Sequence, residues 1–444
     1  ETAAAARHEA EGCLRDADRL GADPAVARLA LCRLLMDQER EAEVVALNEA
    51  AEAPLLLLQR ARAQIALGAF DGAEAALSAV LAQEPGNGPA WQQLAALRRH
   101  ARAPAVIPEA ATDDPLALAE AYAECAEGRD REQLAFALGN MREQAGDYGG
   151  AWAAYTDANA RVRARLPSDI DAVEAHDARI RASLGAETLN RLARGAVTTP
   201  GPVPVFIVGM PRSGTTLMER VLAAHPEAAA LGERGELREV MGAMAPQDAA
   251  ARWPWPERAE RLSPTAAGAI GGAYLARIHA LAPRATVAID KLPNNYALVG
   301  LIAALLPQAR ILSMDRDRRD TAVSNFVAPF HDNLAWTYAL SDIFRRQASL
   351  ERVMAHWRGL LPQGRLRTVA YADLVHEPEA TARSVMAFCG LDPEAAPQPD
   401  TTSPGAPVRT TSAVQAREAI HTGSVGRWRR FALYSPELRH PEIP

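Results

Sequence analysis

The residues from Gly209 to Thr216 have the types and spacing of a loop that binds phosphate. They read Gly-Met-Pro-Arg-Ser-Gly-Thr-Thr, and Gly209 and Gly214 keep the Walker A spacing, but Thr215 stands where that motif has its lysine. Because that lysine contacts the β- and γ-phosphates of a nucleoside triphosphate, its absence argues against ATP. Arg212 and consecutive backbone N–H groups remain as donors for one terminal phosphate. On the glycines alone, an ordinary strand-turn-helix connection is the alternative.

Lys291 also stands out, because it is the only lysine among 48 lysine and arginine side chains. A lysine ammonium is a compact charge that can release a proton, whereas arginine stays protonated. Lys291 follows the apolar run 286–289 and Asp290, and residues at strand ends are frequent functional positions. A chance lysine on a loop is the alternative. An aspartate after an apolar strand is also typical of a Walker B element, which would favour an NTPase.

A parallel sheet would position these residues together. Apolar, β-prone runs at 205–208, 286–289, 310–314 and 366–371 alternate with helical patterns. This alternation predicts an α/β domain with a mainly parallel sheet that is covered by helices on both faces. Ligands bind beyond the carboxyl ends of such strands, where both the phosphate loop and Lys291 lie.

The chain before residue 198 reads as successive helices rich in Ala, Leu, Arg and Glu. The stretches 68–85 and 138–158 repeat a spacing of small and aromatic residues that is typical of tetratricopeptide repeats, which can bind a protein partner. An irregular helical bundle is the alternative. Because 198–202 contains Pro and Gly, we predict a helical tetratricopeptide-repeat domain over 1–198 and the α/β domain over 203–444.

The composition is globular, with 48% hydrophobic and 23% charged residues and a net charge of -7. The negative charge argues against a nucleic-acid partner. The four cysteines are dispersed, so we expect neither a metal site nor a disulfide framework, and a cytoplasmic location. No apolar run is long enough to predict a membrane span.

The string Pro-Arg-Ser-Gly-Thr-Thr-Leu at 211–217 resembles the 5′-phosphosulfate loop of sulfotransferases, particularly tyrosylprotein sulfotransferases and their bacterial relatives with tetratricopeptide repeats. Further motifs follow in the family's order over about 203–430. The resemblance implies a P-loop-like fold and transfer of a sulfuryl group from 3′-phosphoadenosine 5′-phosphosulfate, which leaves as adenosine 3′,5′-bisphosphate. The acceptor would be a hydroxyl of a peptide, such as tyrosine, of a carbohydrate or of a small molecule.

The resemblance also assigns donor-binding roles. It places the 5′-phosphosulfate on the loop residues Arg212, Ser213, Gly214, Thr215 and Thr216. It places the 3′-phosphate on Arg316 and Ser324 and the adenosine beside Tyr371, and it puts Ser412 and Arg417 in a C-terminal flap. The alternatives are a solvated charge cluster around Arg316, a core aromatic for Tyr371 and a polar tail for the flap.

For catalysis, the resemblance implies a glutamate directly after a glycine as the base for the acceptor hydroxyl. Glu233 follows Gly232, but Arg234 stands where the tyrosylprotein pattern has a second glutamate, so Glu236 is the alternative base. We prefer Glu233 because the Gly-Glu step fixes its place best. In a direct in-line transfer, Lys291 and Arg212 would neutralise charge on the leaving oxygen and the sulfuryl group.

Two other functions stay open at this point. A nucleotide kinase or NTPase would bind ATP with Mg²⁺ and would need a cation in place of the missing lysine. A repeat-based interaction protein with a degenerate catalytic domain would bind a partner and transfer nothing.

Overall fold

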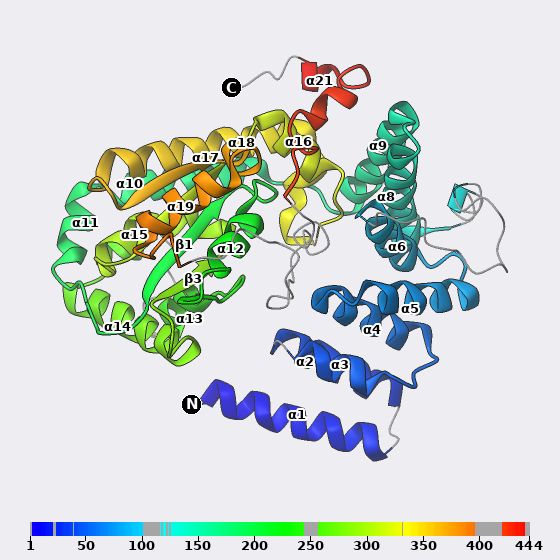
Figure 1. Cartoon of the computed structure of the whole chain (residues 1–444), viewed down its shortest axis with the longest axis horizontal. Helices are drawn as coiled ribbons and strands as arrows, with labels where there is room; N and C mark the ends of the chain where they lie inside the picture. Colours follow the sequence, from blue (N-terminus) through cyan, green and yellow to red (C-terminus); the bar gives the residue numbers. More distant parts are fainter. Residues whose placement is uncertain are drawn as a thin grey trace. The chain divides into compact units, whose positions relative to one another are not determined.

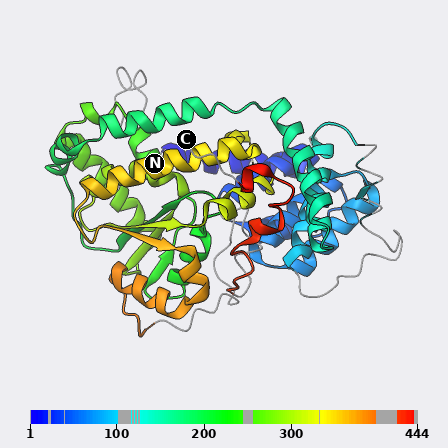
Figure 2. The same ribbon diagram turned by 90° about the horizontal axis from the view of Figure 1, so that it is seen from above.

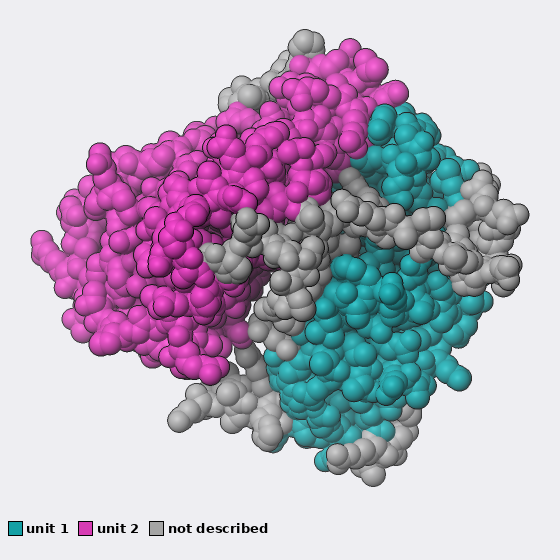
Figure 3. Space-filling view, in the orientation of Figure 1, with its two compact units in different colours: residues 1–165, 327–329, 404–417 teal, residues 166–326, 330–403, 418–444 magenta. Residues whose placement is uncertain are grey.

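Two compact units make up the chain, and Figure 3 shows them in different colours. The computed structural model describes residues 2–20, 24–38, 40–100, 116, 119–120, 123, 126–243, 256–330, 332–395 and 420–439. Unit 1 is formed by the chain up to Arg165, and unit 2 by most of the chain from Leu166 onwards.

Unit 1 is built from helices (Figure 1). These are α1 (Thr2–Leu20), α2 (Pro24–Asp37), α3 (Glu41–Leu47), α4 (Pro54–Leu67), α5 (Phe70–Gln83), α6 (Gly88–His100), α8 (Gly128–Gln144) and α9 (Tyr148–Arg165). Helices pack in chain order, with α4 on α5, α6 on α8 and α8 on α9. The predicted helical N-terminal region is therefore confirmed. Among the described residues of the whole chain, no helix is long and apolar enough to cross a membrane.

Small residues allow close helix contacts in unit 1. At Gly139 of α8, a Cβ would come within 2.4 Å of Cε1 of Tyr155 in α9, so the ring packs directly on the α8 backbone. The Tyr155 hydroxyl lies 2.9 Å from Asn140 Oδ1 and 3.0 Å from Glu143 Oε2. α4 ends at Gly68, whose φ of 80° is a left-handed conformation that favours glycine.

Unit 2 contains a five-stranded sheet with the order β2-β3-β1-β4-β5. Its strands are β1 (Val203–Gly209), β2 (Ala228–Ala230), β3 (Val287–Lys291), β4 (Arg310–Asp315) and β5 (Leu366–Ala370). Each neighbouring pair is parallel, which confirms the predicted parallel sheet. The sequence analysis missed β2, because a run of alanines has weak β-propensity.

Helices cover both faces of the sheet. α12 (Thr215–Ala223) and α19 (Pro378–Cys389) pack on one face, through an apolar core that includes Ile207 and Leu312. On the other face, Phe206 of β1 stacks on Tyr274 of α14 (Pro264–Leu281), with ring centres 5.6 Å apart. α15 (Val299–Leu305) and α17 (Leu340–Leu360) also lie on this side, and Figure 2 shows α17 (yellow) and α19 (orange) on opposite sides of the sheet.

The remaining elements of unit 2 are shorter or lie at the edges. They are α10 (Ile170–Ser183), α11 (Ala186–Ala193), α13 (Glu236–Ala243), α16 (Arg318–Phe326), α18 (Tyr371–His376), α21 (Pro436–Arg439) and the 3₁₀ helices η1 (Ala259–Arg261), η2 (Pro293–Leu298), η3 (Asp332–Tyr338) and η4 (Arg427–Arg430).

A buried ion pair fastens α10 to the α/β unit. Asp177 accepts hydrogen bonds from Arg346 Nη1 at 2.9 Å, from Ser349 Oγ at 2.8 Å and from the Tyr296 hydroxyl at 2.6 Å. Because a buried carboxylate needs such partners, α10 is bound to α17 and η2. The domain boundary at 198–203 stays a prediction. The contacts of the chain place α10 and α11, which precede this boundary, in unit 2.

Candidate functional site

The phosphate loop joins β1 to α12 through a left-handed turn. Arg212 has a φ of 67° and Gly214 a φ of 102°. At Gly214 a Cβ would lie 2.5 Å from Cδ2 of Tyr371, so only glycine fits between the loop and that ring. α12 begins at Thr215 without a side-chain cap, and the first N–H groups of a helix have no intrahelical acceptor. The loop therefore presents main-chain donors at the positive end of a helix dipole.

Ser213 supplies a buried hydroxyl to this loop. The residue is 2% exposed, and its Oγ has no hydrogen-bond partner among the described residues. Its backbone N–H donates to Met210 O at 3.2 Å, which closes the turn. Buried polar groups are nearly always hydrogen-bonded, so this hydroxyl marks a place that a ligand oxygen or a water would complete.

Arg212, Ser324, Arg316 and Tyr371 come together beside the loop. Arg212 Nε donates to Ser324 Oγ of α16 at 3.1 Å. Arg316, which follows β4, donates from Nη1 to Arg212 O and from Nη2 to Ser424 O, both at 2.8 Å. Its guanidinium carbon lies 4.5 Å from the centre of the Tyr371 ring, and its Nε is buried without a partner among the described residues. The structure thus assembles four residues that the sequence analysis placed at the donor site.

A C-terminal segment is fastened to α16 next to this cluster. The Asp320 carboxylate accepts hydrogen bonds from the backbone N–H of Gly426 at 2.6 Å and of Trp428 at 3.0 Å. These bonds hold the segment from residue 420 onwards against α16. The predicted flap residues Ser412 and Arg417 lie outside the described residues.

Lys291 is buried at the end of β3 between two carboxylates. Its Nζ lies 2.6 Å from Glu233 Oε1 and 3.5 Å from Glu219 Oε2. The exposed fraction of the side chain is 1% for Lys291, 9% for Glu219 and 39% for Glu233. Glu219 belongs to α12 and also accepts a hydrogen bond from the backbone N–H of Gly232 at 3.1 Å. Burial raises the pKa of Glu219, although the Lys291 charge opposes this effect.

Glu236, the alternative base, is paired elsewhere. It is the first residue of α13, and its Oε2 accepts a hydrogen bond from Arg277 Nη1 at 2.9 Å. Its Oε1 lies 3.4 Å from Arg234 Nε. Glu233 contacts Lys291 instead, so the geometry favours Glu233, and its role as the base stays a prediction.

Asp290 is buried, and its partners lie on α14 and η2. Its Oδ2 accepts a hydrogen bond from the Tyr274 hydroxyl at 2.9 Å, and its Oδ1 accepts one from Asn295 Nδ2 at 3.3 Å. Burial raises the pKa of Asp290 from 3.8 to about 7. Both carboxylate oxygens of Asp290 therefore already accept hydrogen bonds from buried residues.

A polar cavity of about 300 Å³ adjoins the loop. Four buried polar atoms that line it have no hydrogen-bond partner among the described residues: Ser213 Oγ, Arg316 Nε, Thr321 Oγ1 and Gln347 Oε1. Two of these belong to predicted donor-binding residues. The cavity is therefore lined by two of the residues that the sequence analysis assigned to the donor, Ser213 and Arg316.

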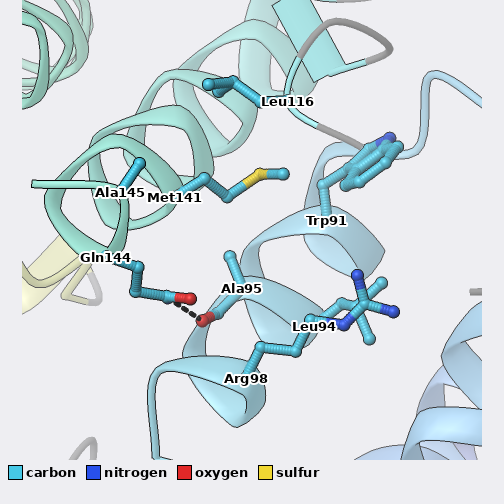
Figure 4. A pocket seen from close by; sticks show the side chains of 8 residues that line it. All are labelled: Trp91, Leu94, Ala95, Arg98, Leu116, Met141, Gln144 and Ala145. Carbon is cyan, nitrogen blue, oxygen red and sulfur yellow. Dashed lines mark hydrogen bonds between the residues drawn. The ribbon is translucent and has the colours of Figure 1, made fainter. Parts of the chain in front are cut away.

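A second cavity of about 430 Å³ lies in unit 1, beside α6 and α8 (Figure 4). Its lining is mostly apolar and consists of Trp91, Leu94, Ala95, Arg98, Leu116, Met141, Gln144 and Ala145. Gln144 Nε2 donates to Ala95 O at 3.2 Å across it. These residues include no carboxylate or hydroxyl, so the candidate site for transfer chemistry is the one in unit 2.

The sequence analysis missed Glu219, and it missed the contact by which Tyr274 binds Asp290. Glu219 lies on the same α12 face as Thr215 and Leu222, which are buried. A carboxylate within such a buried stripe is the signal that could have found it. The hydrogen bond between Tyr274 and Asp290 could not be predicted from a local sequence pattern, because the two residues lie 16 positions apart.

Comparisons with known proteins show similarity to one protein family and to one bacterial protein. Residues 204–395 match the model of the sulfotransferase family. An uncharacterized protein of Aquifex aeolicus (strain VF5) is 30% identical over 325 residues, which cover 68% of this chain, and the chain spans 40% of that relative's length. A sulfotransferase-family domain thus occupies 204–395, where the phosphate loop, Lys291 and Arg316 lie.

Solved sulfotransferases also share structural similarity with the chain. The sulfotransferase domain of the olefin synthase from Synechococcus PCC 7002 is 20% identical, with 52% of this chain and 90% of that domain covered at a TM-score of 0.37. The sulfotransferase from Alicyclobacillus acidocaldarius is 15% identical, with 46% and 85% covered at a TM-score of 0.31.

Proposed function

We propose that the sulfotransferase-family domain moves a sulfuryl group from 3′-phosphoadenosine 5′-phosphosulfate to an acceptor hydroxyl. The observation that carries this proposal is the contact of 2.6 Å between Lys291 Nζ and Glu233 Oε1. It puts a cation and a partly exposed carboxylate beside each other, at the carboxyl end of the parallel strands, where the phosphate loop also lies. A sulfuryl transfer requires a base for the proton of the acceptor hydroxyl and a cation for the charge on the leaving oxygen, and Glu233 and Lys291 can supply them at one place.

The residues present fit this donor. The amides at the start of α12, with Arg212, Ser213, Thr215 and Thr216, would hold the 5′-phosphosulfate. Ser213 Oγ supports this assignment because it is buried without a partner among the described residues. Arg316 and Ser324 would hold the 3′-phosphate. The buried Arg316 Nε supports this assignment, because it has no hydrogen-bond partner among the residues that the structure describes. Tyr371 would flank the adenosine.

The transfer is a direct displacement at sulfur, because the donor supplies an activated sulfuryl group. Glu233 accepts the proton of the acceptor hydroxyl, whose oxygen forms the new bond to sulfur. Lys291 and Arg212 neutralise the negative charge on the bridging oxygen as its bond to sulfur breaks, and on the sulfuryl oxygens. The acceptor hydroxyl belongs to a peptide tyrosine, a carbohydrate or a small molecule.

The NTPase alternative is less favoured by the packing of Asp290. A Walker B aspartate helps to hold Mg²⁺ near the phosphates. Both oxygens of Asp290 accept hydrogen bonds from Tyr274 and Asn295 in the interior. Together with the missing loop lysine, this arrangement favours a phosphosulfate over ATP.

We infer for unit 1 that its helix pairs are tetratricopeptide repeats. The packing of Tyr155 on Gly139 and the left-handed Gly68 support this assignment, because both glycines belong to the predicted repeat pattern. Such a unit can bind a protein partner or a peptide acceptor. A pull-down from a library of tyrosine-containing peptides, with the intact chain as bait, tests whether the protein binds a peptide acceptor.

Calorimetric titration with adenosine 3′,5′-bisphosphate tests the donor site, with ATP plus Mg²⁺ and adenosine 5′-monophosphate as comparisons. We expect the bisphosphate to bind best and Arg316→Ala to weaken it by about 10- to 100-fold, as for a lost charged hydrogen bond. Arg310→Ala, at the other end of the same strand, is the matched control and should bind normally. A preference for ATP would overturn the proposal, and binding of the bisphosphate would justify an acceptor screen with labelled phosphosulfate.

A further inference from the structure

We propose that Glu219 is a positioning residue of the transfer reaction, a buried counter-ion that keeps the Lys291 ammonium charged and in place after Glu233 has accepted the acceptor's proton. This inference rests on the proposed function. It concerns a carboxylate of α12 that neither the phosphate-loop motif nor the glutamate motif includes.

Glu219 connects three parts of the site. One carboxylate oxygen lies 3.5 Å from Lys291 Nζ at the end of β3. The other accepts the backbone N–H of Gly232 at 3.1 Å, directly before Glu233. Glu219 also lies one turn after Thr215, on the same face of the helix that begins in the phosphate loop. One side chain therefore fixes the ammonium relative to both the loop and the base.

Charge balance gives Glu219 its role. Lys291 is 1% exposed, and a buried ammonium is stable only beside an anion. Before the reaction Glu233 is the nearer anion, at 2.6 Å. When Glu233 takes the acceptor's proton it becomes neutral, at the moment when the bond between sulfur and the bridging oxygen breaks. Glu219 is then the carboxylate that remains beside Lys291, so the cation stays available to the leaving oxygen.

Glu219 is placed to act through Lys291 and not to take the proton itself. Its side chain is 9% exposed, against 39% for Glu233, so an acceptor reaches Glu233 first. The Lys291 charge lowers the pKa of Glu219 and the Glu233 charge raises it. The charge of Glu219 in turn raises the pKa of the buried Asp290. Burial raises the pKa of Glu219, and the Lys291 charge opposes only part of this rise.

Kinetics of Glu219→Gln test the role. Glutamine keeps the size and the acceptor for the Gly232 N–H but removes the charge. We expect kcat to fall by about 10- to 100-fold, with the KM of the donor little changed. Glu219→Asp should restore part of the activity. Glu239→Gln is the matched control, because that carboxylate is 53% exposed and pairs with Arg277.

A spectroscopic experiment tests the counter-ion directly. Because Lys291 is the only lysine, protein grown with ¹³C-labelled lysine gives one ε-carbon signal. Glu233→Gln imitates the neutral base, and with Glu219 intact we expect the signal of a charged ammonium at neutral pH. The double variant Glu219→Gln, Glu233→Gln should move this signal towards that of a neutral amine, or bring its pH midpoint to a clearly lower pH.

The outcomes separate the two proposals. One outcome overturns this inference: the single variant Glu233→Gln and the double variant Glu219→Gln, Glu233→Gln give the same lysine signal, and Glu219→Gln lowers kcat only in proportion to a lower melting temperature. Glu219 is then a packing residue. If the wild-type protein binds no bisphosphate, the proposed function fails, whereas the lysine signal still reports whether Glu219 holds the ammonium. Loss of kcat with unchanged bisphosphate binding and a shifted signal supports both.

Discussion

Arg212 of the phosphate loop and Ser324 of α16 share a hydrogen bond of 3.1 Å, from Nε to Oγ. The resemblance assigns these two residues to opposite ends of the donor, one to the 5′-phosphosulfate and the other to the 3′-phosphate. Under the proposed function, this bond would fix the distance between the two anion sites before a nucleotide binds. Rigid placement of this kind lowers the ordering cost of binding.

Ser324→Ala should weaken bisphosphate binding by removing a direct donor and the link to Arg212. We expect about a 10-fold lower affinity, in the range of one hydrogen bond to a charged group. Adenosine 5′-monophosphate, which lacks the 3′-phosphate, should be affected less. Calorimetry with both ligands measures the difference. Ser341→Ala, an exposed serine of α17, is the control, and equal effects of Ser324→Ala on the two ligands would contradict the assignment.

Lys291→Ala should lower turnover much more than nucleotide affinity. The ammonium is assigned to the charge that develops on the leaving oxygen, so its loss should reduce kcat by about 10²- to 10³-fold, as for one oxyanion donor. Bisphosphate affinity, measured by calorimetry, should change little. Equal losses in kcat and affinity would show instead that Lys291 is a general anion-binding residue.

Gly214→Ala should destabilise the phosphate loop. Its φ of 102° strains any other residue, and the added Cβ would lie 2.5 Å from Tyr371. We expect a loss of about 1–3 kcal/mol in the free energy of unfolding together with loss of bisphosphate binding. Gly235→Ala is the control, because a Cβ there meets no atom within 4 Å. Denaturant unfolding of both variants decides whether the loop geometry requires glycine.

Asp290→Asn should change how stability depends on pH. In the folded protein burial raises the pKa of Asp290 from 3.8 to about 7, so its favoured form is the protonated one. The wild type should therefore lose stability relative to the variant as the pH rises from about 4 to about 7, and the difference should be constant above that. Asn295 donates from Nδ2 to Asp290 in the wild type, and when its amide turns over, the buried Oδ1, which has no partner among the described residues, accepts a hydrogen bond from the amide that the substitution introduces. Urea unfolding across this pH range measures the difference, and a difference that does not vary with pH would refute it.

Strong local patterns predicted much of the fold. The four predicted runs became β1, β3, β4 and β5. The inner strands β1, β3 and β4 are mostly buried and apolar, as is usual in a parallel sheet, whereas the edge strand β5 is mostly partly exposed. The helical region before residue 165 was equally clear from its composition. β2 escaped because its alanines carry little strand signal, and α10 was grouped with the earlier helices because its anchor, Asp177, contacts residues far along the chain.

The candidate site was only partly predictable for a similar reason. Arg212, Arg316 and Ser324 belong to motifs, and the structure brings them together. Glu219 belongs to no motif, because its role depends on its contact with Lys291, which lies 72 positions further along the chain at the end of β3. The choice between Glu233 and Glu236 likewise needed the positions of Lys291 and Arg277 in space.

The burial of the chain's single lysine has a practical consequence for limited proteolysis. A protease that cuts only after lysine has one site in this sequence, the bond after Lys291 at the end of β3. Lys291 is buried and β3 lies between β2 and β1, so cleavage of that bond requires this part of the sheet to open locally. The rate of this one cleavage, with and without bound nucleotide, would therefore measure the local opening of the candidate active site by itself.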